Sequence, residues 1–160
     1  MRSLYFSVCL LVLSYDLSAQ DEHVAIMQPI NQLFTGMNKG DSALVHKAFL
    51  ENATLVTIGL DKEGQSFFRR GELSAFLKAM GTPHAETYSE PIWDVKIEVD
   101  GNMAQVWAKY AFYLGKNFHH CGVDAFQLYK EKGGWKIYHL ADTRQTEGCD
   151  VPAAIKNQFK

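Results

Sequence analysis

The chain has 160 residues, a length that supports one domain with an ordinary hydrophobic core and gives no reason to expect two. Its formal net charge is -2 at pH 7 and its basic residues are scattered, so nothing in it predicts a surface for nucleic acid or an anionic membrane. The sequence also lacks a glycine-rich phosphate loop, a nucleophile elbow and a dinucleotide fingerprint, which argues against those enzyme classes.

The N-terminus has the pattern of a secretory signal peptide. Arg2 precedes an apolar stretch, Leu4 to Leu13, and cleavage after Ala19 or Gln20 fits the small residues that follow. The apolar stretch is far shorter than the roughly 20 residues that span a bilayer, which argues against a retained anchor. We therefore expect residues 1–20 to be removed and the mature protein to be soluble, in the periplasm or outside the cell.

The first half of the mature chain reads as helices with a short pair of strands. Asp21 to Lys39 spaces its apolar residues along one helical face, and Asp41 is a good N-cap for a second, short helix. A β-branched strand, Ala53 to Ile58, is followed by a short strand around Phe67. A third helix is predicted over Glu72 to Met80.

The second half reads as four antiparallel strands joined by tight turns. The predicted strands are Trp93 to Val99, Met103 to Leu114, Phe118 to Lys130 and Trp135 to Gln145. A two-residue Asp100-Gly101 loop between the first two strands is a strong hairpin signal and pairs Val99 with Asn102. Because side chains alternate along a strand, this pairing assigns each residue to one of two faces.

One face of this sheet, here called the inner face, is mostly apolar but carries polar groups. Its candidate site residues are Trp93, Tyr110, Phe112, His120, Asp124, Trp135 and His139. The outer face has Trp107, Tyr138 and Leu140 near its middle. An apolar patch there is most simply buried against a second copy of the chain, so we expect a homodimer.

This order of elements predicts an α+β fold in which three N-terminal helices lie on the concave side of a curved antiparallel sheet. The helices cannot cover the whole inner face of a strongly bent sheet. A cone-shaped cavity is therefore expected between the helices and the sheet.

Several segments of the chain resemble the nuclear transport factor 2-like superfamily, in particular its SnoaL-like and lumazine-binding branch from bacteria. The matching pieces are Ile30 to Asp41, Ala53-Thr-Leu, Val99-Asp-Gly-Asn-Met-Ala, His120-Cys-Gly-Val-Asp-Ala-Phe, Gly134-Trp-Lys-Ile and Ala141-Asp-Thr-Arg. The resemblance implies a cone domain over residues 21–148, followed by a tail over 149–160. It also implies an apolar pocket and, commonly, a dimer through the outer face. Known members include isomerases, dehydratases, ligand binders and interaction modules, so the fold does not fix the function.

Asp124 is the leading candidate for chemistry because a carboxylate among apolar neighbours must be paired or protonated. With His139 beside it, Asp124 could act as a general base while Tyr110 or His120 donates to an oxyanion. It could equally hydrogen-bond a ligand, or form a structural pair with His139. The aromatic inner-face residues could line a ligand pocket or fill the core.

Histidines and cysteines leave further alternatives open. Adjacent strand residues point to opposite faces, so His119 and His120 cannot share a metal without a bulge, and we predict neither a metal nor a cofactor. His120, Asp124 and His139 could converge only if their depths matched. Cys121 and Cys149 can form a disulfide or remain separate thiols.

The leading functional hypothesis is an exported protein that binds a small apolar or aromatic molecule, with no catalysis demonstrable from the sequence. The enzyme alternative is a cofactor-independent isomerase, dehydratase or cyclase that uses Asp124 and His139. A dimeric interaction module is the third hypothesis. The sequence leaves open whether the protein is an enzyme.

Overall fold

The computed structural model describes the backbone of residues 4–160 and the side chains from Gln20 onward. Its helices and strands follow one another along the chain, and the strands form a single sheet. The elements are α1 (Leu4–Lys39), α2 (Ser42–Ala48), β1 (Phe49–Leu60), β2 (Ser66–Gly71), α3 (Leu73–Gly81), β3 (Tyr88–Ser89), β4 (Ile92–Asp100), β5 (Met103–Leu114), β6 (Asn117–Glu131), β7 (Gly134–Arg144), α4 (Ala153–Lys156) and the 3-10 helix η1 (Asn157–Phe159).

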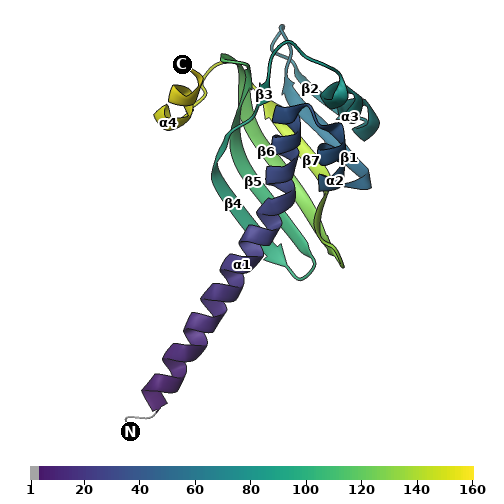
Figure 1. Cartoon of the computed structure of the whole chain (residues 1–160). Helices are drawn as coiled ribbons and strands as arrows, with labels where there is room; N and C mark the ends of the chain where they lie inside the picture. Colours follow the sequence, from purple (N-terminus) through teal and green to yellow (C-terminus); the bar gives the residue numbers. More distant parts are fainter. Residues whose placement is uncertain (1–3) are drawn as a thin grey trace.

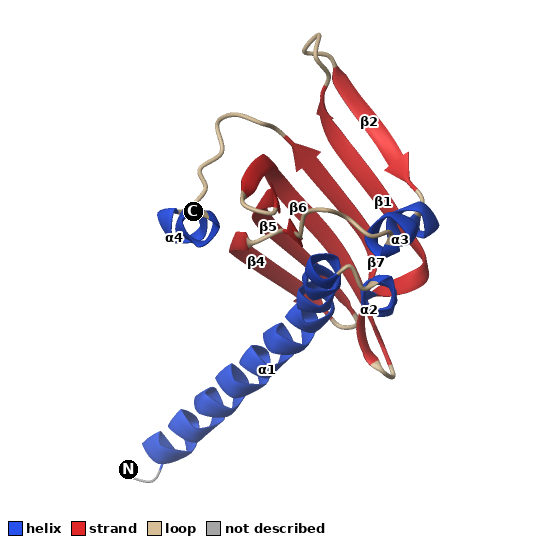
Figure 2. Cartoon of the chain, turned by 45° about the horizontal axis from the view of Figure 1, so that its top comes forward, coloured by secondary structure: helices blue, strands red, loops and turns tan. Residues whose placement is uncertain are grey.

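The seven strands form one curved sheet in the order β2-β1-β7-β6-β5, and both β3 and β4 pair with the far side of β5. All neighbours are antiparallel except β1 and β7, which run parallel. Helices α1, α2 and α3 lie over one face of this sheet (Figures 1 and 2). The α+β architecture predicted from the sequence is therefore confirmed.

Helix α1 extends beyond the sheet at its N-terminal end, as Figure 1 shows. The predicted signal peptide covers residues 1–20. The structure describes no side chain before residue 20, so this prediction lies almost entirely outside the described side chains. Within the described part of the chain, no helix is both long and apolar enough to cross a membrane.

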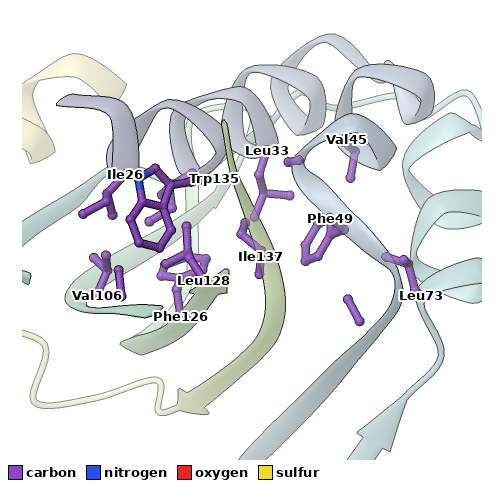
Figure 3. Packing of buried hydrophobic residues seen from close by; sticks show 14 of the residues in the cluster. Ile26, Leu33, Val45, Phe49, Leu73, Val106, Phe126, Leu128, Trp135 and Ile137 are labelled. Atoms are coloured by element: carbon purple, nitrogen blue, oxygen red, sulfur yellow. The ribbon is translucent and has the colours of Figure 1, made fainter. Parts of the chain in front are cut away.

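The main core lies between α1 and the inner face of the sheet (Figure 3). Ile26, Ile30 and Leu33 form one stripe of α1, and each is at most 1% exposed. This stripe packs in one cluster with Phe126 and Ile137 of the sheet. Burying side chains of this size stabilises the fold by roughly 1.5–3 kcal/mol each, which ties α1 firmly to the strands.

The two predicted ends of the first helical hairpin are confirmed. Gly40 ends α1 with a φ of 65°, the left-handed conformation that favours glycine. Asp41 caps α2, because its Oδ1 accepts a hydrogen bond of 2.9 Å from the backbone N–H of Leu44.

The β4–β5 hairpin differs slightly from its predicted pairing. Asp100 pairs with Met103 and Val99 pairs with Ala104, so the loop is Gly101-Asn102 rather than Asp100-Gly101. Moving the loop by one residue changes the pairing partner by two positions. Each side chain of these strands near the turn therefore keeps its predicted face.

Two bulges place some side chains on the opposite face of the sheet from the one predicted. In β4 the pairing jumps between Trp93 and Lys96, with Asp94 at a φ of 50°, and Trp93 packs in the outer cluster rather than on the inner face. In β7 the pairing jumps as well: Leu128 pairs with Ile137 but Gln127 pairs with His139, which leaves Tyr138 as the extra residue. Each extra residue turns the rest of its strand over, because side chains alternate at period two.

The C-terminal tail covers one end of the outer face. Cys149 forms a disulfide with Cys121 of β6, which decides between the two cysteine states left open by the sequence. Val151 and Ile155 are buried against Tyr113 and its neighbours in a second apolar cluster. The tail is thus a packed part of the fold rather than a loose surface segment.

Candidate functional site

A cavity of about 240 Å³ lies between the inner face of the sheet and the helices α1 and α3. Its apolar wall is formed mainly by Leu33, Met37, Leu55, Ala75, Phe76 and Leu140. Its polar residues are Thr57, Arg69, Glu72, Glu90, Tyr110, Asp124, Asp142 and Arg144. Four of these polar residues, Tyr110, Asp124, Asp142 and Arg144, come from the neighbouring strands β5, β6 and β7, which form the floor of the cavity and make it the candidate site.

Asp142 accepts hydrogen bonds from two donors, and a third hydroxyl lies nearby. Thr57 donates to its Oδ1 at 2.7 Å, the Arg144 Nε donates to its Oδ2 at 2.6 Å, and the Tyr110 hydroxyl lies 3.4 Å from that Oδ2. The shorter hydrogen bond of Tyr110, at 2.9 Å, goes to the backbone carbonyl of Thr143. Asp142 is therefore a satisfied carboxylate, balanced by the guanidinium of Arg144.

Asp124 is the least satisfied polar group in this cavity. It is only 2% exposed, and its Oδ2 has no hydrogen-bond partner among the described residues. Its side chain shares a hydrogen bond with Glu90, which comes from the loop between β3 and β4. An orphaned oxygen in a buried carboxyl is costly, so this atom calls for a partner that the chain does not supply.

Burial and their proximity to each other shift both carboxyl groups of this pair towards the protonated form. Burial raises the pKa of Glu90 to about 8, with a further contribution from the charge of Asp142. Burial also raises the pKa of Asp124 well above its usual range, and the neighbouring acidic groups and the hydrogen bond to Glu90 add to the shift. Two acidic groups in contact in an apolar cavity cannot both ionise cheaply.

Gly122 allows the end of β7 to bend into this site. A Cβ atom at position 122 would overlap the backbone carbonyl oxygen of Thr143. The regular ladder is also open here: the backbone N–H of Val123 donates to the Thr143 Oγ1 at 3.0 Å instead of to its carbonyl. The freed Thr143 carbonyl accepts from Tyr110, so glycine at this position underlies the floor geometry.

The structure brings together only some of the residues predicted for the site. Tyr110 and Asp124 line the cavity. Phe112 and His120 are on the inner face as predicted but pack against each other and do not line the cavity. Trp135 is buried under α1, where its Nε1 donates to Glu22 at 3.1 Å. Their roles in ligand binding remain predictions.

The predicted neighbourhood of His139 and Asp124 is wrong. After the β7 bulge, His139 faces outward and its Nδ1 shares a hydrogen bond of 2.6 Å with Thr54, while Asp124 pairs across the ladder with Asp142. Leu140, expected on the outer face, instead lines the cavity. Trp93 is likewise remote from the cavity because of the β4 bulge.

A bulge lies at the two adjacent histidines, which is the condition predicted from the sequence for both to reach one face of the sheet. Phe112 pairs with His120 and Tyr113 with Phe118, which leaves His119 outside the ladder. The two Nδ1 atoms of His119 and His120 are 2.7 Å apart, a hydrogen-bond distance. Burial and the charge of Arg144 lower the pKa of His120 to about 4, so it is neutral at pH 7. Among the side chains that the structure describes, no three His, Cys, Asp or Glu residues are placed to hold a metal.

Sequence reasoning missed Glu90, Asp142 and Arg144. The last two belong to the quoted Ala141-Asp-Thr-Arg segment, yet strict alternation assigned them to the outer face. Glu90 stands in a loop before Pro91, where no periodicity can indicate the direction of a side chain. The polar character of these three residues was the only signal in the sequence for their place at the site.

The curved sheet and its covering helices have the nuclear transport factor 2-like fold, as two similar solved structures show. A nuclear transport factor 2-like protein with a cystatin-like fold from Novosphingobium aromaticivorans matches with a TM-score of 0.66 and 13% identity, over 92% of this chain and 94% of that chain. A protein described as a putative dehydratase of this family, from Streptomyces avermitilis, matches with a TM-score of 0.61 and 15% identity, over 81% of this chain and 99% of that chain.

A third similar structure is described as the beta subunit of a putative aromatic-ring-hydroxylating dioxygenase from Novosphingobium aromaticivorans. It has a TM-score of 0.66 and 13% identity, over 81% of this chain and 93% of that chain. The family model described as "Putative lumazine-binding" matches residues 21–139, and the chain belongs to that family. No curated protein matches the sequence.

Proposed function

We propose that the protein binds a small molecule in the cavity between α1, α3 and the sheet. The observation that supports this proposal most is the buried Oδ2 of Asp124, which lacks a partner on the wall of a cavity with room for a ligand. A ligand atom that hydrogen-bonds this oxygen would remove the cost of leaving it unsatisfied.

The size and the walls of the cavity favour a ligand of one or two rings. A volume of about 240 Å³ is below the ~300–1,000 Å³ of most ligand pockets. Leu33, Phe76 and Leu140 offer apolar contact for a flat molecule, while the polar floor fixes its orientation. Lumazine, which the family description names, is a planar molecule of two fused rings with N–H groups and falls in this size class.

Filling the cavity is expected to abolish ligand retention. Leu140→Trp places a large ring in the cavity, whereas Ala141→Trp places the same ring on the outer face, where Ala141 lines a separate groove. Native mass spectrometry of the mature protein, produced with its export signal, should detect a non-covalent small molecule on the wild type and on Ala141→Trp but not on Leu140→Trp. Equal retention by all three would place the ligand elsewhere, and no retained mass in any would count against the proposal.

Proton transfer to or from the bound molecule is a second candidate function. It is favoured by the Asp124 and Glu90 pair, whose raised pKa values keep a proton available at neutral pH. In this form of the enzyme alternative, Glu90 takes the place that the sequence gave to His139. The description of the Streptomyces avermitilis neighbour as a dehydratase belongs to that protein and supports only the shared fold.

Export of the mature protein remains part of the proposal. The Cys121–Cys149 disulfide supports it, because disulfides persist in oxidising compartments such as the periplasm and the cell exterior. The signal-like pattern of residues 1–20 supports it from the sequence.

A homodimer through the outer face is also proposed, with Trp107 and Tyr138 but without Leu140. Met103, Trp107 and Tyr129 are 52%, 49% and 47% exposed on this face. Large exposed apolar side chains on neighbouring strands are typical of an interface, and mixed charges such as Lys96 and Glu98 beside them suit a self-complementary contact.

Trp107→Glu is expected to shift the protein to monomer, because a charge would be buried in the contact. Sedimentation velocity over a range of concentrations measures this shift. Val24→Glu, which changes a residue that is 68% exposed on α1, serves as the matched control and should leave the sedimentation unchanged. A wild type that is monomeric throughout, or a dimer that survives Trp107→Glu, contradicts this interface.

A further inference from the structure

Among the described residues, the cavity floor leaves one buried acceptor unused, while its tyrosine and threonine hydroxyls already donate within the protein. The single proton of the Tyr110 hydroxyl goes to the Thr143 carbonyl, and that of Thr57 goes to Asp142. Asp124 Oδ2 has no hydrogen-bond partner among the described residues. This oxygen is therefore available as an acceptor. A ligand that donates a hydrogen bond to Asp124 Oδ2 would therefore fit the cavity floor.

The charges around Asp124 favour a donor that carries positive charge. Its charged or titratable neighbours are Glu90 from the β3–β4 loop, Tyr110 of β5, and Asp142 and Arg144 of β7, while Arg69 of β2 and Glu72 at the start of α3 line the same cavity. From the side chains of α1 that the structure describes, only the apolar Leu33 and Met37 line the cavity. Arg144 is balanced by Asp142 and Arg69 lies over the Phe67 ring at 5.0 Å, so neither cation reaches Asp124 with a hydrogen bond in the structure.

Resting on the proposed binding function, we infer that the ligand carries a cationic amine or amidine, whose N–H groups dock on the carboxyl groups of Asp124 and Glu90 in place of one of the two protons that this pair holds. The cation satisfies the unpaired oxygen and balances the single negative charge that the loss of one proton leaves on the pair. Charge-assisted hydrogen bonds of this kind are roughly twice as strong as neutral ones. The rest of the molecule lies against the apolar wall formed by Leu33, Phe76 and Leu140.

Binding of such a cation releases a proton, which gives the inference a distinctive signature. Burial raises both pKa values, that of Glu90 to about 8, and so favours the doubly protonated pair at neutral pH. A bound cation stabilises the pair with one carboxyl ionised, so one proton leaves to solvent as the ligand enters. Affinity should therefore rise as the pH increases from 6 towards 8, since the proton to be displaced becomes easier to remove.

Three probes of nearly equal shape separate the ligand classes: benzamidine is a cation, benzamide is neutral and benzoate is an anion. Isothermal titration calorimetry of the disulfide-intact protein at pH 6 and pH 8, in two buffers of different ionisation enthalpy, measures both affinity and proton release. We expect benzamidine to bind about tenfold or more tightly than benzamide, with proton release and tighter binding at pH 8. Asp124→Asn and Glu90→Gln should each remove this preference, and having two variants protects the test if one fails to fold.

Tighter binding of benzamide or benzoate than of benzamidine would overturn the cationic class while leaving small-molecule binding intact. Benzamidine binding that is unchanged in both variants would show that the acid pair is not its docking point. If none of the three probes binds, the cationic class is also overturned. The binding function itself is tested separately, by the retained mass in native spectra and its loss in Leu140→Trp.

Discussion

Replacing Gly122 with alanine is expected to lower the free energy of unfolding by about 2 kcal/mol or more. The new Cβ would overlap the carbonyl oxygen of Thr143, and a backbone atom cannot swing aside as a side-chain end can. Thr143 would have to move away from Tyr110, whose hydroxyl would lose its bond of 2.9 Å. Arg144 follows in the chain, so its hold on Asp142 would be disturbed as well. Urea unfolding followed by circular dichroism measures the loss.

Gly133→Ala is the matched control for this prediction. Gly133 lies in the turn between β6 and β7, and the nearest atom to an added Cβ is the side-chain end of Glu131 at 3.8 Å. We expect this control to change stability by no more than about 0.5 kcal/mol. Equal stability of Gly122→Ala and the wild type would mean that the close approach of β6 and β7 does not shape the cavity floor.

Removing the disulfide is expected to have the largest effect on stability. The two cysteines are 28 residues apart, and a closed loop of that length stabilises a fold by about 3–4 kcal/mol through the restricted unfolded chain. The double variant Cys121→Ala/Cys149→Ala should lose about this amount. It should also loosen the tail, whose Phe159 ring stacks on Tyr113 with centroids 3.8 Å apart. Urea unfolding and limited proteolysis of the C-terminus measure the two effects.

The reductant response supplies the control for this second prediction. Dithiothreitol should destabilise the wild type towards the level of the double variant and leave the double variant unaffected. A wild type whose unfolding midpoint is the same with and without reductant would contradict a disulfide between Cys121 and Cys149.

Much of the fold follows from local signals in the sequence. The apolar stripe of α1, the Asp41 cap and the glycine turns between strands all act over a few residues. Local patterns of this kind predict the elements from α1 to β7 and their order, except for the two-residue strand β3, and the resemblance to a known superfamily predicts how they assemble. The Asp124 position on the inner face was also correct, because no bulge lies between the β5–β6 pairing around Ala104 and Asp124 itself.

The site itself could be predicted only in part, because two bulges decide which side chains reach it. Nothing in the residue types at the two bulges, Asp94 and Tyr138, distinguishes these positions from ordinary strand positions. A single extra residue is nevertheless enough to move Trp93 and His139 outward and to bring Asp142 into the cavity. Glu90 depends on the path of a loop, which is set by tertiary packing rather than by a repeating pattern.

The raised pKa values of the acid pair have a defined consequence for stability. In the unfolded chain these carboxyl groups lose their protons near pH 4, whereas Glu90 in the folded protein keeps its proton up to about pH 8. Between these two values the folded state binds more protons than the unfolded state. The contribution of the pair to stability is therefore lost as the pH rises through this window, and stays constant below it.

The most direct test of the site is a carbon-13 NMR titration of the side-chain carboxyl groups, with Asp124→Asn and Glu90→Gln used to assign the two resonances. We predict that the Asp124 carboxyl remains protonated at pH 7 and that the Glu90 carboxyl has a midpoint near 8. Together these values would establish a proton-holding pair on the floor of the cavity, on which the proposed ligand contact depends. Midpoints near 4 for both groups would contradict it, because the two carboxylates would then be separate and solvated.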